Sequence, residues 1–415
     1  MEEEKKKQTR KKRKISSRSW YKRAILEILS VCGEMTPRAI RMIRGNDHKR
    51  YIALSEMISY GWVKKDATPI RIRYNKGYRN EKRARYCLDN IKAGYEYYGK
   101  FVEPNYEDFI SAKQKIQTGQ GSSHRKFLEL SEVLVMMYNV GIKITSPPKL
   151  AECEKPQLYI SQFVRQEFKD TPMEERQALL NIPKENIEIM HARFDGLLST
   201  PNRNYLFYDL GKQSRMTLHD FSESVVHMFA NAKQGKAEKL SDVSRLYFVY
   251  NLDLLYDIMY TTWVKKEQGN RGEYVSTEKN MIEGWHQNTY IFPKSHEAEL
   301  MLNLLVNAGV ENINRTLCER HELKAYHEGL NTICDAYEEV DGKYEYHLQM
   351  VAPNVNRLRS YIDVARLREQ MEGYDTKFYV HCFKEYADAI ETFRLPDNFY
   401  IIEEDVNEWI IDLMF

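Results

Sequence analysis

Residues 36–62 read TPRAIRMIRGNDHKRYIALSEMISYGW, and they predict two helices joined by a tight turn. Thr36 followed by Pro37 marks a helix start, as an N-cap and a first-turn proline. The RGN triplet at 44–46 predicts the turn, after which Asp47 can cap a helix whose apolar residues recur at helical spacing. A helix-turn-helix is therefore expected here.

The sequence on either side completes a larger motif. Apolar residues in 20–31 predict a preceding helix, and 62–65, 70–74 and 83–88 predict short strands with a basic tip at 75–80. Three helices followed by a hairpin is the order of a winged helix-turn-helix, which we expect over 19–100. In that fold His48, Lys49, Arg50 and Ala53 would face outward from the recognition helix. The wing would be lined by Arg71, Arg73, Arg79, Lys82, Arg83 and Arg85.

Charge is distributed unevenly along the 415 residues. Residues 1–100 hold 27 Lys and Arg against 11 Asp and Glu, a net +16, so the total of +2 leaves −14 for 101–415. Lys and Arg that contact phosphates release counterions and dominate non-specific DNA affinity. The basic N-terminal part is therefore expected to bind double-stranded DNA, and the acidic remainder is better suited to a basic protein partner.

The length of 415 residues predicts two or three domains, and the order of the predicted helices and strands indicates a protein of the α+β or α/β class. After the winged helix-turn-helix we expect a mixed-sheet body, in which a restriction-endonuclease-like core is one candidate architecture. The predicted segments are a disordered basic tail (1–18), the winged helix-turn-helix (19–100), a linker (101–123), an α/β core with a β-hairpin at 187–210 (124–270), and a C-terminal α/β domain (271–415).

Within the body, residues 187–193 alternate as a strand would, and 205–210 form a compact apolar strand after a turn at 201–204. Residues 127–138 and 217–232 predict helices on either side of this hairpin. In the last third, strands at 288–292, 344–351, 378–383 and 399–403 alternate with helices, which indicates βα units and a parallel or mixed sheet.

The predicted hairpin also carries a candidate catalytic site. Restriction-type nucleases place an aspartate at a strand start and an acid-x-Lys on the next strand, where the carboxylates hold Mg²⁺. Here Asp195 and Asp209 occupy such positions, and Glu129 or Glu132 could supply a third ligand. Lys212 lies three residues after Asp209 rather than two, so it would point to the opposite face unless a bulge at Gly211 corrected the register.

Other functional classes find little support. The histidines form no H-x-H or H-E-x-x-H pattern, His321 and His327 are expected at the surface or at helix ends, and no phosphate-binding G-x-x-x-x-G-K-[ST] occurs. The six cysteines are scattered singly, as in a reduced protein. No apolar run is long enough to span a bilayer, so we expect a cytoplasmic protein without a membrane partner.

The order of these motifs resembles the replication-relaxation family of Gram-positive plasmids and conjugative elements. The resemblance rests on the winged-helix plan, the Gly/Ser-rich linker, the helix opened by His124-Arg125-Lys126, and two blocks, RFDGLL (193–198) and YLFYDLG (205–211). It implies a DNA-binding protein that acts with a relaxase at a transfer or replication origin.

Three functions follow as alternatives. We expect a sequence-specific DNA-binding accessory protein, without a cofactor, that recruits a relaxase or replication protein through its acidic body. The second is a Mg²⁺-dependent nuclease that nicks or cleaves DNA with the Asp195/Asp209 hairpin. The third is a transcriptional autorepressor of its own operon. A homodimer would be expected if the DNA site has two-fold symmetry.

Overall fold

The computed structural model divides into two compact units, residues 1–146 and residues 147–415. Each unit is described by itself. The tail 1–18 and most of the linker 101–123 lie outside the described residues. The structure describes residues 19–66, 70–74, 77–81, 85–88, 122–144, 149–187, 189, 192–212, 220–236, 244–261, 263–269, 272–279, 288–326, 334–371 and 376–414.

Three helices begin the N-terminal unit, and local capping explains where two of them start. The side chain of Thr36 accepts a hydrogen bond from the backbone N–H of Ala39, as predicted, with Pro37 in the first turn. Asn46, rather than Asp47, caps the third helix by accepting from the Lys49 N–H, because Asp47 is already helical. The helices are α2 (Ser19–Cys32), α3 (Pro37–Met42) and α4 (Asp47–Ser59).

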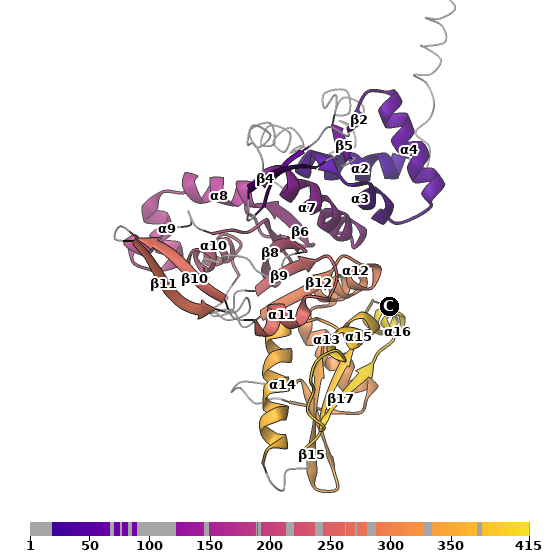
Figure 1. Ribbon diagram of the computed structural model, residues 1–415, viewed down its shortest axis with the longest axis vertical. Coiled ribbons are helices and arrows are strands. Elements are labelled where there is room, and N and C mark those ends of the chain that lie inside the picture. The colour runs from indigo at the N-terminus through magenta and orange to yellow at the C-terminus, as the bar shows by residue number, and fades with distance from the viewer. Residues whose placement is uncertain are drawn as a thin grey trace, which may run out of the picture. The chain divides into compact units, whose positions relative to one another are not determined.

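A small antiparallel sheet of order β1-β5-β2 accompanies these helices (Figure 1). A separate hairpin, β3 paired with β4, lies between β2 and β5 in the chain. The strands are β1 (Glu34–Met35), β2 (Val63–Asp66), β3 (Ile70–Tyr74), β4 (Gly77–Glu81) and β5 (Arg85–Leu88).

Helix α7 (Ser122–Asn139) also belongs to the N-terminal unit, although we expected it to open the following domain at residue 124. It is held by side chains as well as by apolar packing. The Thr36 hydroxyl donates to Glu132 (2.8 Å), and the Asn139 amide donates to the carbonyl of Met42 (2.8 Å). The apolar residues of α7 from Leu130 to Met137 are buried, which requires a partner surface such as α2 and α3 provide.

The second unit contains a first five-stranded mixed sheet of order β12-β9-β8-β7-β6. Strands β6, β7 and β8 are antiparallel neighbours, whereas β8, β9 and β12 run parallel. Because β12 pairs with β9, the predicted boundary at residue 271 falls within the stretch that forms this sheet. The strands are β6 (Gln157–Ile160), β7 (Gly196–Ser199), β8 (Asn204–Gly211), β9 (Ser244–Val249) and β12 (Asn288–Pro293).

The predicted strand at 187–193 is wrong, since the described residues of that stretch are not in a strand and the hairpin begins at Gly196. The guanidinium of Arg165 explains the difference: it donates to the carbonyl oxygens of Ile189 (3.3 Å) and Ala192. These carbonyls are thus satisfied by a side chain instead of a neighbouring strand.

Helices and a hairpin connect the strands of this first sheet. The predicted helix at 217–232 is α10, which lies in the chain between the parallel strands β8 and β9. The β10–β11 hairpin was not predicted. These elements are α8 (Ser161–Asp170), α9 (Met173–Leu180), the 3-10 turn at Lys184–Asn186, α10 (Asp220–Lys233), α11 (Leu255–Tyr260), β10 (Trp263–Gly269) and β11 (Gly272–Lys279).

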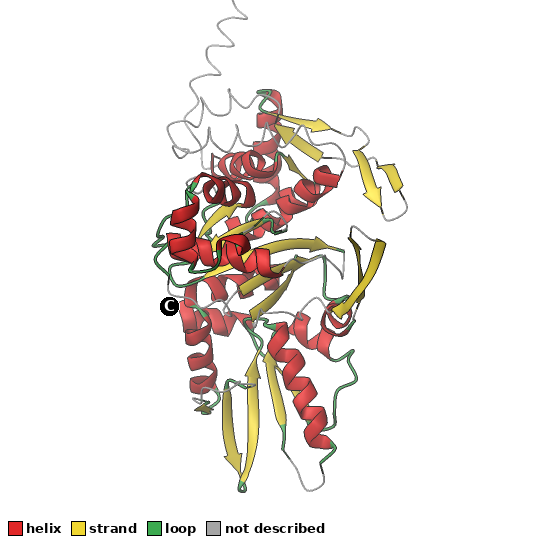
Figure 2. Cartoon of the chain, turned by 90° about the vertical axis from the view of Figure 1, so that its left-hand side faces the viewer, coloured by secondary structure: helices red, strands yellow, loops and turns green. Residues whose placement is uncertain are grey.

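A second five-stranded mixed sheet of order β13-β14-β15-β16-β17 follows, with β15, β16 and β17 parallel. Helix α14 runs alongside it (Figures 1 and 2), and the Tyr361 hydroxyl donates to the carbonyl of Tyr346 on β15 (2.6 Å). The strands are β13 (Lys324–Ala325), β14 (Ala336–Val340), β15 (Lys343–Gln349), β16 (Phe378–Cys382) and β17 (Phe399–Glu403). The helices are α12 (His296–Asn303), the π-turn Leu304–Ala308, α13 (Val310–Arg320), α14 (Val355–Glu369), α15 (Lys384–Ile390) and α16 (Val406–Met414).

The chain is therefore a mixed α+β protein, with N-terminal helices followed by two five-stranded mixed sheets and their helices. The predicted alternation of strands and helices in the last third is confirmed. Within the described residues, no helix combines the length and the apolar character required to cross a membrane.

Gly196 provides a test of this packing. A Cβ added there would lie 2.4 Å from the ring of Phe207 and 2.8 Å from the carbonyl oxygen of Tyr159, both below van der Waals contact. We expect Gly196→Ala to lower the free energy of unfolding by about 1–3 kcal/mol through overpacking. Urea denaturation would measure this, with the exposed turn variant Asn202→Ala as control. Equal stability of the two variants would contradict the close packing of Gly196 against Phe207 and Tyr159.

Candidate functional site

Helix α4 exposes only part of the surface that was predicted to face DNA. His48 and Lys49 are exposed in its first turn. The prediction that Arg50 and Ala53 face outward is wrong, because they are 7% and 0% exposed. Arg50 instead donates to the carbonyl oxygens of Ile43 and Gly45 (2.8 Å for the latter), so its guanidinium stabilises the turn before α4.

The turn between α3 and α4 is also fixed from α2. Gly45 has a φ of +110°, and a Cβ there would lie 2.2 Å from the hydroxyl oxygen of Tyr21. The same hydroxyl accepts a hydrogen bond from the Asn46 N–H (2.8 Å). A residue without a side chain is therefore required at this position. These contacts set the direction in which α4 leaves the turn.

The predicted wing residues are placed by their backbone. Arg71 and Arg73 lie on β3 opposite Asn80 and Tyr78, and Arg79 lies on β4 opposite Ile72. Arg85 is the first residue of β5. Lys82 and Arg83 lie outside the described residues. The four arginines that are described, Arg71, Arg73, Arg79 and Arg85, thus belong to the hairpin and the strand that follows it.

The two aspartates of the predicted nuclease site do lie together. Asp195 immediately precedes β7, and its Oδ2 accepts a hydrogen bond from the backbone N–H of Asp209 on β8 (2.7 Å). Asp209 accepts from the Gly211 N–H through Oδ1 (3.0 Å) and forms an ion pair with Lys294 through Oδ2 (2.9 Å). The side chains of Asp209 and Lys294 are 2% and 1% exposed, so this pair is buried.

Lys212 is not part of this cluster. The register of β8 against β9 shifts between Asp209 and Gly211. This is the kind of irregularity that could have turned Lys212 toward the aspartates. Lys212 is nevertheless exposed, with its Nζ 4.4 Å from the ring centroid of Tyr250. The lysine that lies beside Asp209 is instead Lys294, which directly follows β12. Sequence reasoning missed it because it follows Asp209 by 85 residues and only the parallel strand pairing brings the two together.

The predicted third acidic ligand lies on α7, in the N-terminal unit. Glu129 is half-buried there. Glu132 is 7% exposed and accepts from Thr36, with Arg38 at 3.7 Å. The contacts of Glu132 hold the helices of its own unit together, and both glutamates are placed in a different unit from Asp195 and Asp209.

The buried ion pair predicts a difference between the two lysines. Lys294→Gln would leave the Asp209 carboxylate buried without its cation, so we expect a loss of roughly 3–5 kcal/mol in the free energy of unfolding. Lys212→Gln, at an exposed position, should change it by less than about 0.5 kcal/mol. Denaturant unfolding of both variants would measure this. Equal losses of unfolding free energy in the two variants would show that the Asp209–Lys294 pair does not stabilise the fold.

Comparisons with known proteins identify no family. No protein-family model matches the chain, and no curated protein or solved structure is significantly similar to it. The resemblance to the replication-relaxation family therefore stays a prediction, and function has to be argued from the geometry of these residues.

Proposed function

We propose that this protein is a sequence-specific double-stranded DNA-binding protein of a mobile element. It would act at a transfer or replication origin and recruit a relaxase or replication protein. The observation that carries the proposal is the order of elements in the N-terminal unit. A helix, a short strand, two helices joined by a tight turn, and a hairpin between strands β2 and β5 match a winged helix-turn-helix.

In this proposal α4 is the recognition helix and the β3–β4 hairpin is the wing. The exposed His48 and Lys49 lie at the N-terminal end of α4, where the recognition helices of such motifs contact base edges. The exposed Lys64 and Lys65 lie on β2. Arg50 holds the turn and so would orient the recognition helix without touching DNA.

The charge of each part supports the same division of roles. Residues 1–100 carry +16, which favours phosphate contacts. Residues 101–415 carry −14, and an acidic surface favours a basic protein partner over further contact with DNA. The resemblance to the replication-relaxation family suggests a relaxase or replication protein for that partner.

A specific observation also favours the nuclease alternative. Strands β6, β7 and β8 form an antiparallel meander, and α10 then leads to the parallel strand β9, as in a restriction-endonuclease-like core. Asp195, Asp209 and Lys294 lie together on this frame. However, both oxygens of Asp209 are already engaged and its side chain is buried, so Mg²⁺ would have to displace Lys294. We therefore rank this function second.

Charge reversal on the proposed interface tests DNA binding. The variant Lys49→Glu/Arg71→Glu/Arg73→Glu should lose most of its affinity for duplex DNA, and its salt dependence should fall by about one unit for each phosphate that the variant no longer neutralises. Gel-shift titrations at several salt concentrations would measure both, with Lys324→Glu, an exposed lysine on β13, as the matched control. Unchanged binding by the triple variant would exclude this interface.

A nicking assay separates binding from cleavage. We expect the wild-type protein to bind duplex DNA without Mg²⁺ and to leave a supercoiled plasmid carrying the site intact when Mg²⁺ is added. Asp195→Asn, which keeps an oxygen to accept the Asp209 N–H, serves as the comparison. Mg²⁺-dependent nicking that Asp195→Asn abolishes would replace the binding function with the nuclease.

A further inference from the structure

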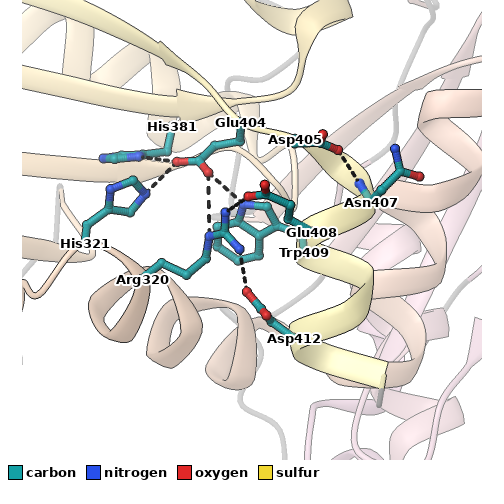
Figure 3. Close-up of polar contacts among 9 residues, drawn as sticks. All are labelled: Arg320, His321, His381, Glu404, Asp405, Asn407, Glu408, Trp409 and Asp412. Carbon is teal, nitrogen blue, oxygen red and sulfur yellow. Dashed lines mark hydrogen bonds and ion pairs between the residues drawn. The ribbon is translucent and has the colours of Figure 1, made fainter.

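Three polar side chains from separate segments converge beside the second sheet (Figure 3). His321 follows the last turn of α13, His381 lies on β16, and Glu404 comes directly after β17. The Nε2 atom of His321 and the Nδ1 atom of His381 each lie 2.7 Å from the same oxygen, Oε1 of Glu404. One atom from each of the three residues thus falls within a sphere small enough for a single ion, since all lie within 4.8 Å of one another.

The protein holds two of the three donors, Glu404 and His381, in place through their other polar atoms. Glu404 Oε2 accepts from the indole N–H of Trp409 (3.0 Å) and lies 3.8 Å from Arg320, which leaves Oε1 toward the imidazoles. His381 Nε2 lies 2.9 Å from His347 Nδ1. Metal-binding histidines and carboxylates characteristically have such partners, which fix the ring orientation and the tautomer.

Formal charge at this position leaves room for a divalent ion. Arg320 pairs with Glu408 (2.5 Å) and Asp412 and lies near Glu404. Within this group of residues one cation, Arg320, therefore faces three carboxylates, a formal net −2 for these four side chains. Glu404 and His381 are 4% and 0% exposed in their side chains, so this excess of negative charge lies partly out of water.

We propose that His321 Nε2, His381 Nδ1 and Glu404 Oε1 bind one divalent transition-metal ion, with Zn²⁺ the best match. Two imidazoles and a carboxylate are a donor set that Zn²⁺ takes, whereas Mg²⁺ and Ca²⁺ prefer oxygen. Three protein ligands would leave a coordination position for water, and solvent reaches the edge of the site because the His321 side chain is 29% exposed. The ion would link α13 and β16 to the segment that leads into α16.

Metal titration of the full-length, tag-free protein tests the site. After treatment with a chelator, the wild type should bind one equivalent of Zn²⁺ in calorimetry, and Zn²⁺ should raise its melting temperature. X-ray absorption of the loaded protein should show nitrogen and oxygen ligands, including two imidazoles, without sulfur. Absence of saturable binding at one equivalent, or sulfur ligation, would overturn the proposal, and neither measurement needs a variant.

Variants then assign the ligands. His321→Gln and Glu404→Gln should each weaken Zn²⁺ binding by at least roughly 100-fold, since loss of an outer partner alone typically costs 10–100-fold. The matched control is His296→Gln, a histidine with a 74% exposed side chain on α12. Wild-type affinity in folded His321→Gln and Glu404→Gln would refute the assignment.

Discussion

A buried ion pair between Arg245 on β9 and Glu223 on α10 connects the first sheet to the helix that joins its two central strands. The Nη2–Oε2 distance is 2.9 Å, and the two side chains are 1% and 0% exposed. The hydroxyl of Tyr208 on β8 donates to the same carboxylate (2.7 Å), and burial raises the pKa of this tyrosine well above its usual value. Removing either charge would leave the other buried without this ion pair, which is strongly unfavourable. This network therefore links β8, α10 and β9.

The aspartate cluster depends on the same frame. With β8 and β9 parallel, β12 parallel to β9, and a register shift only after Asp209, the carboxyl ends of three strands lie at one edge of the sheet. Asp209 and Lys294 meet there as a buried pair. A nuclease and a structural ion pair could both be built from such residues, but the complete engagement of the Asp209 oxygens favours the structural role. DNA binding is therefore proposed for the N-terminal unit.

The two polar clusters of the second unit differ in chemistry. Around Asp209, the carboxylate forms an ion pair with the Lys294 ammonium, and both side chains are sealed from water. Around Glu404, carboxylates outnumber cations and one imidazole reaches solvent. The first arrangement stabilises a fold, whereas the second leaves donors and negative charge for an added cation. This contrast, rather than the presence of acidic residues alone, separates a structural cluster from a candidate binding site.

Local sequence determined those features that depend on neighbours in the chain. Thr36 and Pro37 start α3 because capping and proline geometry act within one turn, and the strands of the last third follow from apolar runs and turn residues. The separation of a basic N-terminal part from an acidic remainder can likewise be counted directly from the sequence. Tertiary structure decided the rest. Arg50 turns inward because carbonyl oxygens of the preceding turn lie within its reach. Strand pairing puts Lys294 rather than Lys212 beside Asp209, and the fold brings His321 to His381 across 60 residues. Contacts between distant segments depend on packing and register, which no local pattern encodes.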